Sequence, residues 1–397
     1  MTDFSKTRDM FDLPEGVIYL DGNSLGPLPR TASARVTARM ADEWGAMLIT
    51  AWNKAGWMDD PRRIGDRVGR LVGAAAGTIV MGDTLSIKVH QALASALDLR
   101  PDRRVILSDT GNFPSDLYMA QGLIGTIGKG HCLKTVAPEA VIDAITDEVA
   151  VVMVTEVDYR TGRKHDMDAI IAKAHAVGAL VIWDLAHSAG ALPVALTESG
   201  VDFAVGCTYK FLNGGPGAPA FIYVHPDLAP NCRPALSGWL GHEAPFAFDP
   251  DYRAGGGIDR MRCGTPPVLA LAALDAALDV WDEVDMDDLR ARSIELSERF
   301  IKGVEAASPM LTLVSPRDPA QRGSQVSFAF DDGYAAMQAV IARGVIGDFR
   351  APNIMRFGIT PLYLSEDDID RAMEIIAEVM TNRLWDDPQY KKHAAVT

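Results

Sequence analysis

The sequence predicts an α/β fold in which helices cover both faces of a mostly parallel sheet. Four short apolar runs are typical of buried strands, and they lie at residues 105–107, 149–154, 179–183 and 201–205. Between the runs stand patterns with helical spacing, such as the one formed by Met167, Ile170, Ile171, Ala174 and Val177. Strands that alternate with helices in this way form parallel sheets, because each crossover returns the chain to the same edge.

The next apolar run, at residues 218–224, breaks this alternation. Only a Gly- and Pro-rich turn separates it from the preceding strand, which is too short for a helical crossover. We therefore expect this strand to pair antiparallel to its neighbour.

The chain is predicted to form two domains. Residues 51–285 would form a large cofactor-binding domain, and residues 286–397 a small α+β domain, with a helical connector beyond Pro266 and Pro267. In the small domain we expect strands at 325–330 and 354–360 and helices at 334–342 and 366–380. Residues 1–50 are expected to pack with the small domain, partly through a helix from Pro29 to about Trp52.

Composition narrows the classes of function. The 397 residues are 48% hydrophobic, and 38 basic residues face 53 acidic ones, for a net charge of −15. This charge disfavours nucleic acid and anionic membranes as partners. The four cysteines form no CxxC pair, which indicates neither a zinc site nor a disulfide framework and favours a reducing cytoplasm. No signal-peptide pattern and no apolar run of the roughly 18 residues that span a bilayer is evident.

Two strand ends carry the strongest chemical signal. Lys210 stands between the strand at 201–205 and the small residues at 213–217, a position typical of the lysine that binds pyridoxal 5'-phosphate. Asp184 ends the strand at 179–183, and a carboxylate beside the cofactor's pyridine nitrogen would keep that nitrogen protonated. A lysine alone at a strand end is more often merely solvated, so the pair carries the prediction.

Three weaker signals support a cofactor site. Residues 84–86 precede an apolar-periodic helix and could bind a phosphate at its N-terminus, although they also suit an ordinary helix cap. Phe113 follows the strand at 105–107 and could stack on a flat cofactor or belong to the core. His187 lies three residues after Asp184, but two ligands do not define a metal site, so no metal is predicted.

The chain resembles the kynureninase family, which belongs to the aspartate-aminotransferase-like fold group of pyridoxal-phosphate enzymes. The likeness extends from Tyr19 to Tyr363, nearly the whole chain. Its most specific stretches are residues 21–26, 52–57, 113–116, 184–190, 209–217, 237–242 and 347–352.

The resemblance implies roles for named residues. Lys210 would hold the cofactor covalently, Asp184 its pyridine nitrogen and Phe113 its ring face. The other cofactor contacts implied are Leu85, Ser86, Asp116, Thr155, His187, Tyr209, Trp239 and Thr265, of which Trp239 and Thr265 would reach the site of the neighbouring subunit in a homodimer. Arg356 would grip the substrate's α-carboxylate, and Ser24, Trp52, Asn53 and Trp57 would line the pocket for its aromatic end.

The function so implied is hydrolysis of the Cβ–Cγ bond of L-kynurenine or 3-hydroxykynurenine, in tryptophan catabolism. Lys210 would take the α-proton, and Tyr209 is the expected proton shuttle. Departures from the family pattern at Leu85, Lys88, Glu156 and Asp158 leave open a lyase for a different β-substituted amino acid.

Three other functions are compatible with parts of this pattern. A cysteine desulfurase would need a cysteine in the C-terminal half, and none follows Cys263. An aminotransferase would need a keto-acid acceptor, and slow transamination stays open as a side reaction. A binding module without turnover conflicts with the joint presence of Lys210, Asp184 and Arg356.

Overall fold

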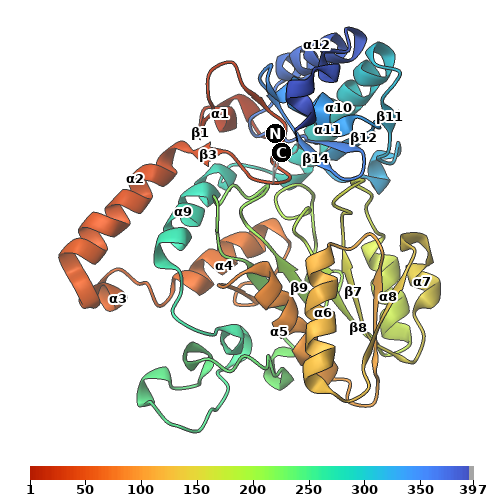
Figure 1. Cartoon of the computed structure of the whole chain (residues 1–397). Coiled ribbons are helices and arrows are strands. Elements are labelled where there is room, and N and C mark those ends of the chain that lie inside the picture. Colours follow the sequence, from red (N-terminus) through yellow and green to blue (C-terminus); the bar gives the residue numbers. More distant parts are fainter. Residues whose placement is uncertain (393–397) are drawn as a thin grey trace.

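The computed structural model describes residues 1–392, and its centre is a seven-stranded sheet (Figure 1). The strands, in spatial order, are β4 (Ile79–Met81), β10 (Phe221–Val224), β9 (Phe203–Gly206), β8 (Leu180–Asp184), β7 (Val149–Thr155), β5 (Val105–Asp109) and β6 (Cys132–Val136). The five strands from β9 to β6 pair parallel, as predicted.

The strand β10 runs antiparallel to both of its neighbours, which confirms the expectation for residues 218–224. Gly206 lies opposite Phe221, and a Cβ at Gly206 would lie 2.5 Å from the Phe221 ring, so only glycine admits that ring. Neither β4 nor β6 was predicted from the sequence. β4 has only three residues, and the edge strand β6 has no fully buried residue and so lacks an apolar run.

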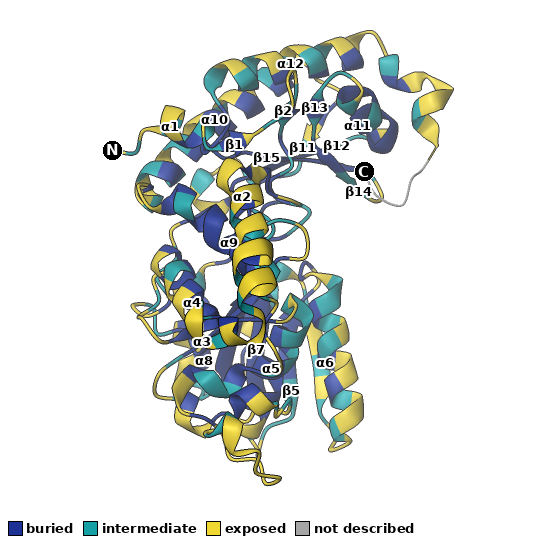
Figure 2. Ribbon diagram, turned by 90° about the vertical axis from the view of Figure 1, so that its left-hand side faces the viewer, coloured by how far each residue is buried: buried dark blue, intermediate teal, exposed yellow. Residues whose placement is uncertain are grey.

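Side chains of each central strand alternate between two hydrophobic layers. In β8, Leu180 and Ile182 pack with α5 (Leu85–Asp98) and α6 (Pro114–Ile127), while Val181 and Trp183 pack on the opposite face. That second face is covered by α4 (Asp60–Leu71) and α8 (Met167–Ala176). The large sheet is therefore buried on both sides, and the outer faces of its helices remain exposed (Figure 2).

A second, antiparallel sheet lies in the C-terminal part of the chain. Its strand order is β11 (Thr312–Leu313), β12 (Gln325–Ala329), β15 (Ile354–Gly358) and β14 (Asp348–Arg350). The helices α10 (Met286–Ala307), α11 (Gly333–Ile341) and α12 (Glu366–Thr381) accompany it. The two strands and two helices expected here are present within a few residues of their predicted ends.

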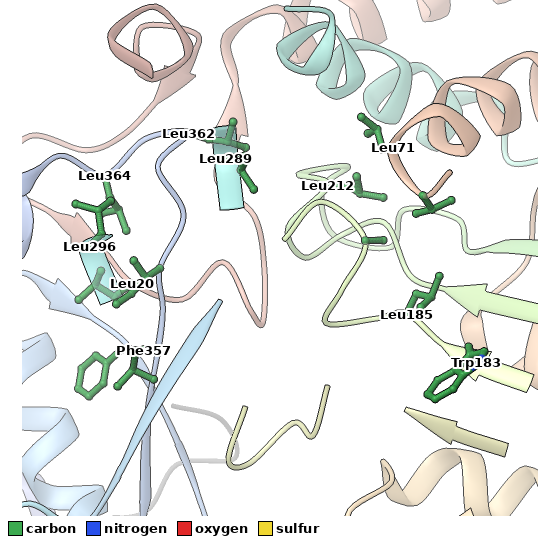
Figure 3. Packing of buried hydrophobic residues seen from close by; sticks show 14 of the residues in the cluster. Leu20, Leu71, Trp183, Leu185, Leu212, Leu289, Leu296, Phe357, Leu362 and Leu364 are labelled. Carbon is green, nitrogen blue, oxygen red and sulfur yellow. The ribbon is translucent and has the colours of Figure 1, made fainter. Parts of the chain in front are cut away.

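The N-terminal segment contributes to two further two-stranded sheets. β2 (Ile18–Tyr19) pairs parallel with β13 (Val345–Ile346), and Gly358 N donates to Leu20 O (2.7 Å). Figure 3 shows Leu20 beside Leu296 and Phe357 in this part of the core. The short α1 (Phe4–Arg8) and the pair β1 (Phe11–Asp12) and β3 (Leu28–Pro29) complete the segment.

The long helix expected from Pro29 to about Trp52 is interrupted. α2 (Arg30–Ala38) passes into a π-helical turn (Arg39–Gly45) and a 3-10 turn (Leu48–Thr50) before α3 (Ala51–Lys54). α2 packs along α9 (Val268–Leu278), away from the small sheet (Figure 1). The domain boundaries at residues 50 and 285 stay predictions. No helix within residues 1–392 is long and apolar enough to cross a membrane.

Candidate active site

Lys210 lies at the carboxyl edge of the large sheet, in the turn between β9 and β10. The edge is where open α/β sheets bind ligands, because the strand ends there diverge into loops. Gly26 lies against this turn, where a Cβ would come within 2.5 Å of Lys210 O. A cavity at this point is lined by Asn23, Ser24, Leu85, Phe113, Thr155, Tyr159, Asp184, Ala186, His187, Tyr209, Lys210, Arg350 and Arg356.

Most residues predicted for the cofactor therefore meet in one place. Thr155 and Asp184 are the last residues of β7 and β8, and Phe113 follows β5. The Phe113 ring centroid is 6.0 Å from Lys210 Nζ, and Tyr159 meets the same ring edge-on at 5.1 Å. Parallel strands bring these ends together, although they are far apart in the sequence.

Two buried carboxyl groups form a pair below the lysine. Asp184 accepts from Ala186 N (2.8 Å) and from Thr155 Oγ1 (3.3 Å), and the side chain of Asp116 is hydrogen-bonded to it. Burial raises the pKa of Asp116 well above its ordinary range, and the nearby Asp184 charge raises it further. Burial also raises the pKa of Asp184, but the Lys210 ammonium opposes that rise. Asp116 therefore keeps its proton and Asp184 is the ionised member.

His187 contacts the lysine directly. Its Nε2 lies 2.9 Å from Lys210 Nζ, and the ring is buried. Burial lowers the pKa of His187 well below its ordinary value, and the charges of Lys210, Arg356 and Arg350 lower it further. The imidazole is thus neutral, and its Nε2 accepts a hydrogen bond from the ammonium group of Lys210.

Two helix N-termini meet at one end of the cavity. Thr84 is the N-cap residue of α5, Leu85 and Ser86 are its first two residues, and Ser115 lies in the first turn of α6. The Oγ atoms of Ser86 and Ser115 are 3.0 Å apart. Free amide groups, two hydroxyl groups and the positive ends of two helix dipoles suit a phosphate group.

Arg356 also lines the cavity and is almost fully buried, at 1% exposure. Its Nε donates to Asp348 Oδ1 (2.6 Å) and its Nη2 to Asp348 Oδ2. Nη2 also donates to Ser24 Oγ (2.9 Å), and Nη1 donates to Tyr159 O. Arg350 Nη2 shares the same Asp348 carboxylate at 2.9 Å. Two arginines around one carboxylate leave a net positive charge that suits an anionic substrate group.

The residues predicted from the motif at 52–57 do not line this cavity within one chain. Trp52 and Trp57 meet edge-on at 5.4 Å, and Trp57 lines a separate hollow with Trp44 and Pro266. Asn53 is exposed.

Trp239 and Thr265 also lie outside the cavity. Trp239 is 41% exposed and contacts the exposed Phe246 ring, while Thr265 is exposed on the segment that leads into α9.

Two of the departures from the family pattern have local partners outside the cavity. Asp158 Oδ1 accepts from the backbone N–H groups of Arg160 and Thr161, both at 2.8 Å, and so closes a turn. Burial raises the pKa of Glu156, while Ser188, Lys164 and Arg290 act to lower it. Neither residue lines the cavity around Lys210.

Sequence reasoning missed several residues of the site. Asn23, Ser115, Asp348 and Arg350 stand inside stretches that carry the family resemblance, so their motifs were a usable signal. Tyr159 had no such signal, because only the turn after β7 brings its ring to Phe113. Among the residues described, no group of three or more His, Cys, Asp or Glu side chains could hold a metal ion.

The arrangement fits pyridoxal 5'-phosphate, group by group. A lysine amine is available for the aldehyde, an ionised carboxylate for the ring nitrogen, and a phenyl ring for one ring face. The buried His187 Nδ1 has no partner within residues 1–392 and is a polar atom that a bound polar group could satisfy.

Comparisons with known proteins agree with this fit. Residues 289–376 match the family model described as the kynureninase C-terminal domain. The chain is 49% identical to a kynureninase of Pseudomonas fluorescens, over 98% of this chain and 95% of that protein. It is 48% identical, with the same coverage, to a kynureninase of Burkholderia pseudomallei strain 1106a.

Solved structures with lower sequence identity show the same fold. A C-DES mutant with glycine covalently linked to its PLP cofactor has a TM-score of 0.81 at 19% identity, over 95% of this chain and 100% of that one. An apo cysteine desulfurase of Thermococcus onnurineus NA1 has a TM-score of 0.79 at 18% identity, over 96% and 99%. These likenesses confirm the predicted fold class and carry no statement about the reaction.

Proposed function

The chain belongs to the kynureninase family, and on that premise we propose that it hydrolyses the Cβ–Cγ bond of L-kynurenine, of 3-hydroxykynurenine or of both, with pyridoxal 5'-phosphate as cofactor. The products are L-alanine and anthranilate or 3-hydroxyanthranilate. One observation supports the proposal above all others: a single cavity is lined by Lys210, Asp184, Phe113 and Arg356. The lysine, acid, aromatic ring and carboxylate-binding arginine that the reaction needs are thus within reach of one small molecule.

When bound, pyridoxal phosphate supplies an electron sink for the electron pairs released at Cα and Cβ of the substrate. We assign Lys210 Nζ to hold the cofactor covalently and then to move the proton at Cα. His187 Nε2, at 2.9 Å, orients that amine. Asp184 holds a proton on the pyridine nitrogen, and the protonated state of Asp116 leaves Asp184 ionised for this task.

The remaining assignments concern the two ends of the ligand. The N-terminus of α5, with Leu85 and Ser86, binds the phosphate. Arg356 binds the α-carboxylate. Tyr209 lines the cavity, and burial raises its pKa, so its hydroxyl stays protonated and can give a proton to Cβ, which becomes the methyl carbon of alanine.

We further propose a homodimer in which each chain completes the other's site. Trp239 and Thr265 are exposed, and neither lines the cavity of its own chain. The exposed Phe246 and Phe248 extend the apolar surface around Trp239, as in a protein interface. Trp52, Asn53 and Trp57 are assigned to the aromatic end of the substrate pocket across the same interface.

The direct test is incubation of the cofactor-loaded protein with kynurenine and with 3-hydroxykynurenine. Alanine and the matching anthranilate should appear in equal amounts, and Lys210→Ala should produce neither. A protein that shows the visible band of lysine-bound cofactor but turns over neither compound would favour the second candidate, a related lyase for another β-substituted amino acid.

The shared site has its own test. Lys210→Ala and Trp239→Ala subunits, each inactive alone, should regain activity when mixed, because one site of the mixed dimer has both intact parts. Mixed dimers without activity would argue against the assignment of Trp239.

A cysteine desulfurase reaction is not favoured. The four cysteines precede residue 264, so the loop at 315–324 has no sulfur acceptor. The cysteines are unpaired, which supports a place in the reducing cytoplasm, and the proposed substrate supports a role in tryptophan catabolism.

A further inference from the structure

Lys88 is fully buried, at 0% exposure, in the second turn of α5. All three protons of its ammonium group have partners. Nζ donates to Asp83 Oδ2 (3.1 Å), to Gln91 Oε1 (3.0 Å) and to Met261 O (3.0 Å). Burying an ammonium group costs free energy unless all of its protons have partners, so these three hydrogen bonds are needed to hold Lys88 in the interior.

One side of this network is the turn that begins α5. Asp83 directly precedes the N-cap residue Thr84 and has a positive φ of 58°. Its carbonyl oxygen accepts from Ala220 N (3.1 Å), and its carboxylate is held by Lys88. The ammonium therefore fixes the conformation of the turn that presents Leu85 and Ser86.

The other side is the segment that carries Trp239 and Thr265. Gln91 Nε2 donates to Met261 O (3.2 Å) and to Cys263 Sγ (3.3 Å). Leu240 N donates to Cys263 O (3.2 Å). Gly238 packs directly against the backbone of Cys263, because a Cβ at residue 238 would come within 2.2 Å of Cys263 O. The backbone on both sides of Trp239 is thus packed on the residue two positions before Thr265.

We propose that Lys88 is a positioning residue that joins the two halves of the phosphate site: the turn at 83–86, which serves its own subunit, and the segment at 238–265, which serves the partner's. The inference rests on the proposed function, since it needs a phosphate-bearing cofactor and a shared site. Lys88 contacts neither the cavity nor its ligand, and it acts through Asp83 and Met261.

The consequence is a defect that depends on phosphate. Lys88→Met removes the bonds to Asp83 and Met261 while keeping most of the apolar volume. Loss of hydrogen bonds to a charged group is expected to weaken cofactor binding on the order of tenfold. Pyridoxal, which lacks the phosphate, should bind within about twofold of the unaltered protein, because Lys210, Asp184 and Phe113 are unaffected.

The experiment measures the dissociation constants of pyridoxal phosphate and of pyridoxal by titration of the visible absorbance band. Sedimentation must show that the variants remain in the oligomeric state of the unaltered protein. Ser95→Ala is the matched control, because Ser95 is buried two turns later on the same helix and its hydroxyl makes no hydrogen bond to Lys88, Asp83, Gln91 or Met261 within residues 1–392. Gln91→Leu, which keeps the bond from Lys88 to Met261, should show the same pattern with a smaller shift and serves if Lys88→Met does not fold.

Mixed dimers test separately the two halves of the phosphate site, the turn at 83–86 and the segment at 238–265. In a dimer of an unaltered subunit with a Lys88→Met/Lys210→Ala subunit, the only lysine-bearing site belongs to the unaltered chain and is completed by the variant's segment. Weaker phosphate-dependent binding there, relative to a dimer with Lys210→Ala alone, supports action across the interface. Equal affinity of the two mixed dimers for pyridoxal phosphate would overturn the proposal. An equal loss of affinity for pyridoxal would overturn it as well. Failure of the unaltered protein to bind the cofactor or cleave kynurenine would instead refute the proposed function.

Discussion

The replacement of Arg356 by lysine tests how the substrate's carboxylate is bound. An arginine has five N–H donors, and four of them are engaged: two by Asp348, one by Ser24 and one by Tyr159 O. Within residues 1–392 the remaining N–H, on Nη1, has no partner. A carboxylate that binds Nη1 and Nη2 side by side must therefore displace the Ser24 oxygen from Nη2, while the Ser24 hydroxyl continues to donate to Asp348 Oδ2.

The magnitude follows from this count. Lysine offers a point charge in place of a planar fork, so the carboxylate keeps one charge-assisted hydrogen bond and loses the second. Such a bond is worth about 1.5–3 kcal/mol. We expect kcat/KM for kynurenine to fall roughly 10- to 150-fold, since each 1.4 kcal/mol corresponds to about a factor of ten. The absorbance of the bound cofactor should not change.

The assay is steady-state release of anthranilate, with Arg299→Lys as the matched control. Arg299 also binds a carboxylate through Nε and Nη2, that of Asp370 at 2.5 Å for both bonds, but it lies on the exposed face of α10. Arg299→Lys should leave kcat/KM unchanged. If Arg356→Lys retains full kcat/KM in a folded protein, Arg356 does not bind the substrate through its fork.

Four further outcomes are expected. Lys210→Ala should lose the visible cofactor band and all turnover while keeping its circular dichroism spectrum; retained activity would refute the central assignment. Asp184→Asn should still bind cofactor but lower kcat at least about tenfold, through lost charge stabilisation, and near-normal rates would mean that another group protonates the ring. Burial and then Asp348 raise the pKa of Asp21 to about 8. Asp21 therefore ionises as the pH rises through 8, offsets the arginine charges and should raise KM between pH 7 and 9, a rise that Asp21→Asn should remove. The same raised pKa means that the native state binds the extra proton between about pH 4 and 8, so the free energy of unfolding should fall with rising pH across that window in denaturant titrations of the unaltered protein compared with Asp21→Asn.

Periodicity was enough to predict the centre of the fold. The runs at 149–154, 179–183 and 201–205 are apolar throughout because both faces of a parallel sheet are covered, and they correspond to β7, β8 and β9. The interrupted helix after Pro29 was not predictable in this way. Its π-helical turn places Trp44 at 56% exposure, and sequence spacing does not show whether such a side chain faces a core or a partner.

The site was predictable to the extent that its residues stand at strand ends or in the family's motifs. Lys210 and Asp184 were predicted from their positions at strand ends and Thr155 from the resemblance, and the parallel strands bring these carboxyl ends together. The hydrogen bonds from the Arg356 guanidinium to Asp348 were not predictable from the sequence, because Asp348 lies opposite Arg356 in a strand pair that forms only in the folded chain. Trp239 is assigned to the site of the partner subunit, so the structure of a single chain does not place it in the cavity around Lys210.

The charged departures from the family pattern bear on the choice of substrate. Negative charge at Glu156 and Asp158 would disfavour an anionic substrate only if it faced the ligand. Asp158 instead accepts two backbone N–H groups of its own turn, and Glu156 lies outside the cavity with its pKa raised by burial, which favours its neutral form. Lys88 forms an ion pair with Asp83, which balances its positive charge. None of the three changes the charge that an α-carboxylate meets beside Arg356 and Arg350, so these departures give no physical reason to expect a substrate other than kynurenine or its 3-hydroxy derivative.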